Sequence, residues 1–372
     1  MGRTVTILGA GNGGHALAFH LSSMGHEVLL FEHPDFKRNL EGIQRNDGIE
    51  AVQELKSNGK TIPSALAGFE EVARLSTDPA EAMSFSDVVF MIVPSYAQET
   101  IFGMVMPHLR DGQTIITMPG NLASLVFRRM LRELPDRPEI IFAEAPTIPY
   151  AVRLVGEGKI FMLGVKETIE LAVLPSSSIG AVLEGIKGLF SARLIPMANV
   201  LQSGFSNMNM VVHVPTATLS MGLAESRGGR FQFYAEGMSE SVSKVQEAID
   251  HERMEIGRAM GLELKPFVES VNEMYGLEAR NIRDFAVNTP YHNRFPDDFP
   301  RSPRERYISE DCPYILVPIH QFGDLVKKEH PVISSLITID SVYNDEDYMS
   351  EGRTFEDLGL EGMTLQEILD TI

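Results

Sequence analysis

Hydrophobic residues in the first half of the chain form short runs that are separated by longer stretches with helical spacing. Each run contains four to eight apolar residues, mostly β-branched or aromatic, and is bounded by Gly, Pro or Asp. Such runs are typical of strands that are buried on both faces. The five clearest predicted strands cover residues 3–10, 26–32, 86–94, 113–120 and 138–146.

The stretches between these predicted strands favour helices. "GGHALAFHLSSMG" (13–25) and "YAQETIFGMVMPHL" (96–109) both place apolar residues at helical intervals. Strands that alternate with helices imply βαβ units, and therefore an α/β fold with a doubly wound parallel sheet of the Rossmann type. Two further predicted strands, 159–166 and 192–197, are expected to extend the same sheet.

The pattern changes after residue 197, where strand-like runs nearly vanish and long helical stretches take over. The stretch 233–261 predicts one helix, which carries a Glu240/Lys244 pair and ends at Gly261. We therefore expect a Rossmann dinucleotide-binding domain over 1–197, followed by an all-helical domain over 198–372.

Two further signals refine the predicted helical domain. The Pro- and Arg-rich segment 288–307 predicts an irregular loop. Thr364 and Glu367 form the pattern of a capping box, which predicts the start of the last helix.

Composition narrows the class of protein. A chain of 372 residues with 44% hydrophobic and 22% charged residues is typical of a globular protein of two domains. No apolar run is long enough to cross a membrane, and the N-terminus lacks a signal-peptide pattern, so a cytoplasmic location is expected. The net charge of −19 argues against nucleic acid and anionic membranes as partners.

Metal and disulfide chemistry find little support in the sequence. The single cysteine, Cys312, excludes an internal disulfide and a cysteine-based metal cage. The ten histidines include no H-x-x-x-H or H-x-H pair, so no metal site is predicted.

The strongest local motif is "ILGAGNGGHALA", which contains G-x-G-x-x-G as Gly9, Gly11 and Gly14. It follows the first predicted strand and begins the first predicted helix, as dinucleotide binding requires. A glycine-rich turn without a ligand is the less favoured alternative. The predicted cofactor contacts in this turn are Gly9, Gly11, Asn12, Gly13 and Gly14.

Glu32 lies at the end of the second predicted strand, where a carboxylate accepts a hydrogen bond from the ribose 2′-hydroxyl. A carboxylate repels a 2′-phosphate, so we expect NAD, with NADP as the alternative. Lys37 and Arg38 follow closely and could weaken that preference.

Loops at the carboxyl ends of later strands are expected to line the same crevice. The segments 91–98 and 118–121 follow the third and fourth of the five clearest strands, and Pro94 and Ser95 are the predicted cofactor contacts there. The segment 144–153 follows the next strand, and Thr147 and Tyr150 are its predicted substrate contacts. Glu144 and Arg153 lie in the same segment, although a solvated arginine is an equally good interpretation.

His213 lies in the apolar run "NMNMVVHVPT" (207–216). On this pattern alone, a hydrogen-bonded core histidine is favoured over a proton carrier. Asn207 and Asn209 precede it and suggest a polar cluster, because asparagine is a poor helix former.

A second polar cluster lies in "RERYISEDCPYILVP" (304–318). It contains the acidic pair Glu310 and Asp311, with Arg306 a few residues earlier. An acidic helix start beside a solvated arginine explains this pattern equally well.

The sequence resembles the opine dehydrogenases of the octopine and nopaline type, in particular the shorter bacterial members. Four blocks in the right order carry the resemblance, which spans nearly the whole chain. These blocks are "GAGNGGHALA", "SNMNMVVHVPT", "RYISEDCPYILVP" and "EGRTFEDLGLEGMT". The family's fold is a Rossmann domain followed by an all-helical domain, which agrees with the pattern of the chain.

The resemblance implies a role for several residues. His213 and Asp311 stand at the positions of the family's catalytic histidine and its carboxylate partner, which act in a cleft between the domains. Arg306 matches the arginine that holds a substrate carboxylate, and Asn207 and Asn209 are the remaining predicted substrate contacts. The sequence departs from the family pattern at Met210, Cys312 and Ile315.

The reaction implied by the resemblance is a reductive condensation. A pyruvate-like α-keto acid and the amino group of an amino acid form an imine, which NAD(P)H reduces to a secondary amine dicarboxylate. The expected partners are therefore these two small molecules. A homodimer with a second copy of the chain is a separate expectation.

Two alternatives remain open from the sequence. A reductase of the ketopantoate, glycerol-3-phosphate or hydroxyacid type would share the architecture, and Lys244 and Lys265 would be its candidate lysines. A non-catalytic NAD-responsive protein would keep the cofactor site without turnover.

Overall fold

The computed structural model describes residues 2–57, 60–289, 292–293, 295 and 298–372. The chain forms two compact units. The first unit contains Met1–Ser203 together with Ile372, and the second contains Gly204–Thr371. The change to helical structure that the sequence predicts at residue 197 lies close to this division.

The first unit is built on an eight-stranded sheet with the order β14-β13-β10-β9-β8-β1-β2-β7. The strands from β10 to β7 are parallel, whereas β13 runs antiparallel to β10 and parallel to β14. Strand order reverses at β1, which lies between β2 and β8, so the sheet is doubly wound as predicted. The strands are β1 (Thr4–Leu8), β2 (Glu27–Phe31), β7 (Arg74–Ser76), β8 (Val88–Met91), β9 (Thr114–Thr117), β10 (Ile141–Glu144), β13 (Thr168–Leu174) and β14 (Arg193–Pro196).

The predicted strands are continuous apolar runs because residues on both faces of the central strands are buried in the core of this unit. Val5 and Ile7 of β1 are fully buried, as are Leu17 and Phe19 of α1 to within 1%. The helices that follow or cover the strands are α1 (Asn12–Ser23), α2 (Arg38–Asn46), α3 (Pro79–Phe85), α4 (Ser95–Val105), α5 (Ala123–Leu131), α6 (Ile179–Gly185) and α7 (Val200–Phe205), together with the short turns η1 (Pro34–Phe36), η2 (Met106–His108) and η3 (Ser176–Ser178).

A second, four-stranded sheet has the order β11-β12-β3-β6. The prediction that 159–166 extends the main sheet is wrong, because β12 pairs with β11 and β3 instead. The reason is a tight turn at Gly158 (φ +66°), which folds the chain directly back on itself. The prediction for 192–197 is confirmed, since β14 joins the main sheet. The strands of the small sheet are β3 (Ile49–Ala51), β6 (Gly68–Glu70), β11 (Tyr150–Gly156) and β12 (Lys159–Val165).

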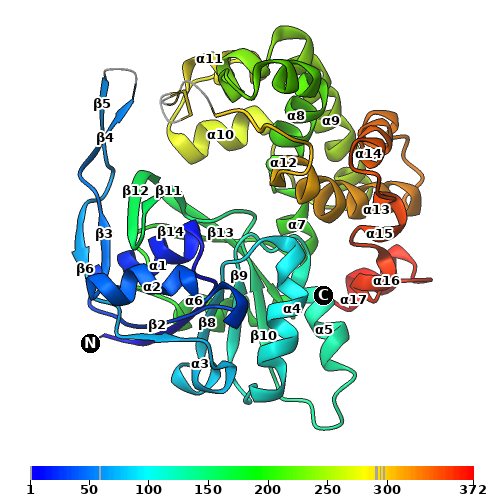
Figure 1. Ribbon diagram of the computed structural model, residues 1–372. Coiled ribbons are helices and arrows are strands. Elements are labelled where there is room, and N and C mark those ends of the chain that lie inside the picture. Colours follow the sequence, from blue (N-terminus) through cyan, green and yellow to red (C-terminus); the bar gives the residue numbers. More distant parts are fainter. Residues whose placement is uncertain (1, 58–59, 290–291, 294, 296–297) are drawn as a thin grey trace. The chain divides into compact units, whose positions relative to one another are not determined.

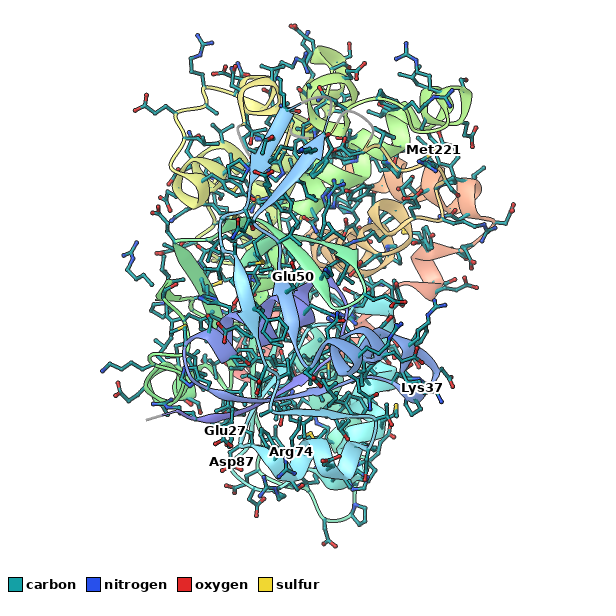
Figure 2. The ribbon with its side chains drawn as sticks, turned by 60° about the vertical axis from the view of Figure 1, so that its left-hand side comes forward. Glu27, Lys37, Glu50, Arg74, Asp87 and Met221 are labelled. Carbon is teal, nitrogen blue, oxygen red and sulfur yellow. The ribbon has the colours of Figure 1, made fainter. Side chains whose placement is uncertain are left out.

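Between β3 and β6 the chain makes an antiparallel two-stranded ribbon of β4 (Glu54–Ser57) and β5 (Lys60–Pro63). Figure 1 shows this ribbon extending away from the rest of the first unit. Figure 2 shows Glu27, Lys37, Arg74 and Asp87 on the outside of the first unit, where all four side chains are exposed.

The second unit is helical, and the part of it that the structure describes contains no strand, which confirms the predicted all-helical domain. Within the described residues, none of the chain's helices is both long and apolar enough to cross a bilayer. The elements of the second unit are α8 (Asn209–Arg227), η4 (Phe233–Gly237), α9 (Glu240–Ala259), α10 (Phe267–Tyr275), α11 (Ile282–Asn288), α12 (Arg306–Ser309), η5 (Cys312–Leu316), α13 (Val317–Leu325), α14 (Pro331–Asn344), α15 (Tyr348–Glu351), α16 (Phe355–Leu358) and α17 (Leu365–Asp370).

Helix ends follow the capping signals more closely than the hydrophobic pattern does. The single helix predicted over 233–261 is divided, because the Ser239 side chain caps α9 and separates it from the π-helical turn η4. Gly261 follows α9 in the left-handed region (φ +76°), and the predicted capping box of Thr364 and Glu367 begins α17. The described residues of the predicted loop 288–307 contain neither helix nor strand between α11 and α12.

Arg253 connects three segments of the second unit. Its guanidinium is fully buried and donates to Asp250 Oδ1 on α9, to the Phe205 carbonyl and to the Lys265 carbonyl. Asp250 in turn accepts a hydrogen bond from the Phe267 N–H at the start of α10. A buried charge with this many partners fixes the geometry of the bundle, because each lost contact would leave a desolvated polar group.

Candidate active site

The glycine-rich turn lies between β1 and α1, at the carboxyl end of the central strand. Gly9 adopts φ +103°, and a Cβ there would lie 2.5 Å from Val93 Cγ1. A Cβ on Gly14 would lie 1.8 Å from the Gly9 carbonyl oxygen. Both glycines are therefore required by the packing of the turn itself.

Gly11 differs, because nothing lies within 4 Å of the position that its Cβ would occupy. It is the N-cap residue of α1, and no side chain caps that end of the helix. The open space and the N–H groups of the first turn fit a pyrophosphate, which binds favourably at a helix N-terminus. Gly13, whose Cβ would lie 2.6 Å from Ile92 Cγ2, lets the first turn of α1 pack closely on the end of β8.

Glu32 follows β2 and is 94% buried, since its exposed fraction is 6%. Its Oε2 accepts hydrogen bonds from Ala10 N (3.0 Å) and Asn39 Nδ2 (2.9 Å), and its Oε1 accepts from His33 N (2.8 Å). The carboxylate is thereby fixed beside the glycine-rich turn. A carboxylate can accept about four hydrogen bonds, so a ribose hydroxyl still has a place on it.

The other predicted cofactor contacts have defined positions in the first unit. Asn12 is the first residue of α1, and its side-chain Oδ1 accepts a hydrogen bond from Leu154 N of β11 at 2.6 Å. Its backbone N–H belongs to the first turn of α1, where a cofactor contact is predicted. Pro94 is the N-cap residue of α4, and Ser95 begins that helix and is buried. Ser95 Oγ accepts from Asn121 Nδ2 (2.9 Å), which joins the loops after β8 and β9.

The last residue of β10 and the residues that follow this strand are mostly engaged within the first unit. Glu144 is fully buried and accepts from the N–H groups of Leu122 (3.0 Å) and Ser124 (2.7 Å), so it caps α5. Tyr150 is 4% exposed, and its hydroxyl bonds to His20 Nδ1 of α1 at 2.8 Å. Burial raises the pKa of this phenol well above its usual range. The predicted substrate contact at Tyr150 therefore finds no support in its position.

Thr147 lies beside a lysine that the sequence pattern does not single out. Lys166 Nζ donates to Thr147 Oγ1 at 2.8 Å. Burial of the ammonium lowers the pKa of Lys166 to about 7, and the Glu170 carboxylate acts in the opposite direction. Arg153 lies on β11 and is exposed.

The second unit brings His213 and Asp311 together. His213 Nδ1 lies 2.7 Å from Asp311 Oδ2, and the side chains are 13% and 2% exposed. His213 belongs to the second turn of α8, whereas Asp311 lies directly after α12, which packs beside α8 (Figure 1). Among the described residues, His213 Nε2 has no hydrogen-bond partner. The arrangement orients the ring through Nδ1 and leaves Nε2 for proton exchange.

Aromatic rings enclose the histidine. The Tyr307 ring centre lies 4.3 Å from that of His213, and Phe233 lies 5.8 Å away at nearly a right angle. Sequence reasoning missed both residues. Tyr307 lies next to Arg306 in the block "RYISEDCPY", so the family resemblance could have indicated it as a site residue. No motif in the sequence indicates Phe233, which lies on η4.

Arg306 begins α12, so its backbone lies one turn from Asp311. Its guanidinium is 57% exposed, and its Nε lies 3.4 Å from Oε2 of the buried Glu310. An anchored yet exposed guanidinium is suited to a carboxylate ligand, which it can bind with two parallel hydrogen bonds.

Asn207 precedes α8 and Asn209 is its first residue, so both lie at the start of the helix rather than in its middle. Asn207 is 2% exposed, and its Oδ1 accepts from Asn209 N at 3.0 Å. This bond satisfies an N–H at the start of the helix that carries His213, so Asn207 positions α8.

A further buried carboxyl group contacts α8 and Cys312, the residue next to Asp311. Asp340 on α14 is fully buried, and its Oδ1 accepts from Thr218 Oγ1 of α8 at 2.7 Å. Burial raises the pKa of Asp340 to about 7, and hydrogen bonds from Thr218 and Cys312 act in the opposite direction. Met210, Cys312 and Ile315, which depart from the family pattern, are all buried.

A doubly wound sheet with a glycine-rich turn at its switch point, joined to a helical unit with an oriented histidine, defines a dinucleotide-dependent oxidoreductase. Two family models match this chain. The model of the NAD-dependent glycerol-3-phosphate dehydrogenase N-terminus matches residues 4–132. The model of the NAD/NADP octopine/nopaline dehydrogenase alpha-helical domain matches residues 196–344.

Relatives match the chain over its whole length. The opine dehydrogenase of Arthrobacter sp. (strain 1C) is 30% identical over 373 residues, which cover 100% of this chain and 99% of the relative. The vitopine synthase of Allorhizobium ampelinum is 27% identical and covers 99% of this chain and 98% of its own length. The solved structure of octopine dehydrogenase in complex with NADH and agmatine has a TM-score of 0.74 at 18% identity, covering 98% and 97% of the two chains, and shows the same fold.

The chain belongs to the opine dehydrogenase family. It is an NAD(P)-dependent oxidoreductase that acts on CH–NH donors. The family resemblance, the Rossmann fold and the cofactor class predicted from the sequence are thereby confirmed.

Proposed function

We propose that this enzyme condenses a pyruvate-like α-keto acid with the amino group of an amino acid and reduces the product to a secondary amine dicarboxylate. Condensation releases water and forms an imine. Addition of a hydride to the imine carbon, which a bound reduced nicotinamide would supply, and of one proton to the nitrogen would then give the amine. The observation that carries the proposal is the 2.7 Å contact between His213 and Asp311, with Nε2 of the same ring unengaged among the described residues.

His213 is the proposed proton carrier. Its Nδ1 is the donor to the acceptor-only carboxylate of Asp311, so the lone pair or the second proton resides on Nε2. Water loss during condensation and protonation of the imine both need an acid near neutral pH, and a histidine oriented by a carboxylate meets that need. Tyr307 and Phe233 cover the ring and restrict the access of water to it.

Arg306 is the proposed anchor for a substrate carboxylate. The whole chain carries a net charge of −19, so an anionic substrate needs a local cation. The Arg306 side chain is 57% exposed, and its Nε lies 3.4 Å from Glu310 Oε2, so the guanidinium is held in position and accessible to a carboxylate. Asn209, at the start of the same helix as His213, and Thr147 are further proposed substrate contacts.

The proposed cofactor contacts are the turn Gly9–Gly14, Glu32, and the α4 start at Pro94 and Ser95. The open position above Gly11 would take the pyrophosphate, and Glu32 would accept from the ribose. When bound, NAD(P)H supplies the hydride. The buried Glu32 carboxylate supports a preference for NADH, because a 2′-phosphate beside it would be repelled.

The test is NADH oxidation with pyruvate alone, with an amino acid alone, and with both. The proposal requires turnover only with both substrates. Turnover with the keto acid alone would instead identify a hydroxyacid-type reductase, and a lack of turnover across a panel of amines and keto acids would contradict the proposal. A panel of amines against pyruvate, glyoxylate and oxaloacetate also identifies the substrates. The cytoplasmic location and the homodimer stay predictions.

A further inference from the structure

A second cluster of histidine and carboxylate groups lies in the helical unit on different elements from His213. His320 and Asp324 stand one turn apart on α13, and His330 immediately precedes α14. One potential ligand atom from each residue can be chosen so that all three lie within 4.8 Å of one another. We propose that His320, Asp324 and His330 form a binding site for a divalent transition metal ion of the zinc type.

The distances between the three side chains support this proposal. His330 Nε2 lies 3.6 Å from Asp324 Oδ1, and His320 Nε2 lies 3.5 Å from Asp324 Oδ2. Ligand atoms about 2 Å from a tetrahedral zinc ion stand roughly 3.3 Å apart, so the nitrogen–oxygen distances are close to those of a formed site. His330 Nε2 and His320 Nδ1 are 2.7 Å apart, as a shared hydrogen requires. His320 can offer only one ring nitrogen to an ion. Coordination through Nδ1 would replace that hydrogen and place the two nitrogens roughly 0.6 Å further apart, whereas coordination through Nε2 would use the nitrogen that faces Asp324.

His330 is oriented in advance for such a role. Its Nδ1 lies 2.7 Å from the Lys328 carbonyl oxygen, which can only accept, so Nδ1 carries the proton. In the neutral ring the lone pair is therefore on Nε2, which faces His320 and Asp324. A backbone carbonyl on the second ring nitrogen is the usual way in which proteins fix a metal-binding histidine.

Gly323 makes room for this ring. A Cβ at Gly323 would lie 2.5 Å from His330 Nδ1, so a glycine at this position lets the imidazole pack closely on α13. His330 is 6% exposed, whereas the Asp324 side chain is 67% exposed. The cluster thus has a buried and an open side, and water could complete the coordination on the open side.

The donor set indicates the class of metal. Two imidazoles and one carboxylate suit zinc, cobalt and nickel, whereas magnesium and calcium prefer oxygen ligands alone. The spacing H-x₃-D-x₅-H contains neither H-x₃-H nor H-x-H, which is why sequence inspection predicts no site here.

The experiment uses the full-length enzyme without a polyhistidine tag, treated with a chelator and then titrated with ZnCl₂ by calorimetry and with CoCl₂ by absorption spectroscopy. We expect one equivalent to bind and the melting temperature to rise by a few degrees. His330→Ala, Asp324→Asn and Gly323→Ala should each weaken zinc binding at least about tenfold.

His251→Ala is the matched control, because His251 is an exposed histidine on α9 of the same unit, and its zinc affinity should equal that of the wild type. Circular dichroism verifies that each variant is folded. The absence of saturable binding of either metal, or unchanged affinity in a folded His320→Ala/His330→Ala variant, would overturn the proposal. Both readouts are independent of turnover, so neither result depends on the proposed reaction.

Discussion

At the scale of single residues, the pair of His213 and Asp311 shows how a weak local signal becomes specific. In isolation, a histidine in an apolar run favours a satisfied core residue, and His213 does make a buried hydrogen bond. Its partner lies 98 residues away in sequence, on a different element. Only the family block that contains Asp311 could predict the pairing, because no periodicity links residues that far apart.

Replacement of the carboxylate tests this pair directly. Asp311→Asn preserves size but removes the charge that stabilises a protonated His213, and its amide can stabilise the wrong tautomer of the ring. We expect kcat to fall by roughly 10²- to 10⁴-fold. NADH affinity, measured by the change in its fluorescence on binding, should stay within about twofold of the wild type.

His213→Ala should abolish turnover with the same retention of NADH binding. The chain has no tryptophan, so the fluorescence titration has little protein background. Normal turnover in this variant would remove His213 from the mechanism.

Arg306 makes a separate prediction about substrate binding. Loss of a charge-assisted contact corresponds to about 1.5–3 kcal/mol, so Arg306→Ala should raise KM for the keto acid or amino acid by roughly 10- to 100-fold. Steady-state kinetics with each substrate varied in turn identifies which carboxylate it holds. Lys244→Ala, which removes one exposed positive charge from the same unit, is the control and should leave both KM values unchanged.

At the scale of elements, the turn between β1 and α1 separates two uses of glycine. Gly14→Ala would force a Cβ to 1.8 Å from the Gly9 carbonyl, whereas Gly11→Ala meets no protein atom within 4 Å. We expect Gly14→Ala to destabilise the enzyme by several kcal/mol, since such overpacking distorts the backbone. Gly11→Ala should leave the melting temperature nearly unchanged and weaken NADH binding at least about tenfold.

Thermal unfolding and NADH titration of the two variants distinguish these outcomes. Equal NADH affinity in Gly11→Ala and the wild type would show that the pyrophosphate does not approach that backbone position.

The same scale shows what the hydrophobic pattern can and cannot predict. The central strands β1, β2, β8, β9 and β10 of the main sheet are mostly buried, and their continuous apolar runs identified them. The pattern also identified β12 as a strand but assigned it to the wrong sheet, because a buried run carries no information about its neighbour. The partly exposed strands β3 to β7 are three or four residues long, which is too short for a period of two to stand out.

The candidate site divides in a similar way. Gly9, Gly14 and Glu32 are tied to a defined strand and turn, so their positions follow from the motif and its context. Tyr150 follows a strand that was expected to line the crevice, yet its hydroxyl bonds to His20 inside the first unit. The direction of the Tyr150 side chain depends on the packing of α1 against β11. The sequence pattern does not predict this contact, because the two segments are far apart along the chain.

At the scale of the whole molecule, Asp340 links folding stability to pH. Burial raises the pKa of this carboxyl to about 7 in the folded state, whereas in the unfolded chain it lies near 4. Between about pH 4 and pH 7, Asp340 holds a proton in the folded state but not in the unfolded state. Its contribution to the free energy of unfolding is therefore largest below about pH 4 and is lost as the pH rises towards 7.

Asp340→Asn removes that titration while it retains an oxygen for Thr218. We expect the free energy of unfolding to increase by roughly 1–3 kcal/mol at pH 8 and to change little at pH 4.5, as measured by urea denaturation. Asp345→Asn, at a 92% exposed side chain beyond the end of the same helix, should change stability equally little at both pH values. A pH-independent effect of Asp340→Asn would show that the carboxyl does not titrate in this range.

Glu32, the residue proposed to select the cofactor, also makes contacts that stabilise the first unit. The carboxylate that would reject a 2′-phosphate also accepts the Ala10 N–H inside the glycine-rich turn, together with Asn39 and the His33 N–H. If Glu32 selects the cofactor as proposed, its replacement to favour NADPH would also leave the buried Ala10 N–H of the turn without its acceptor. A redesign of the proposed cofactor selectivity would therefore have to change the glycine-rich turn as well as Glu32. The contacts of Glu32 with Ala10 and Asn39 are the first that such a redesign must replace.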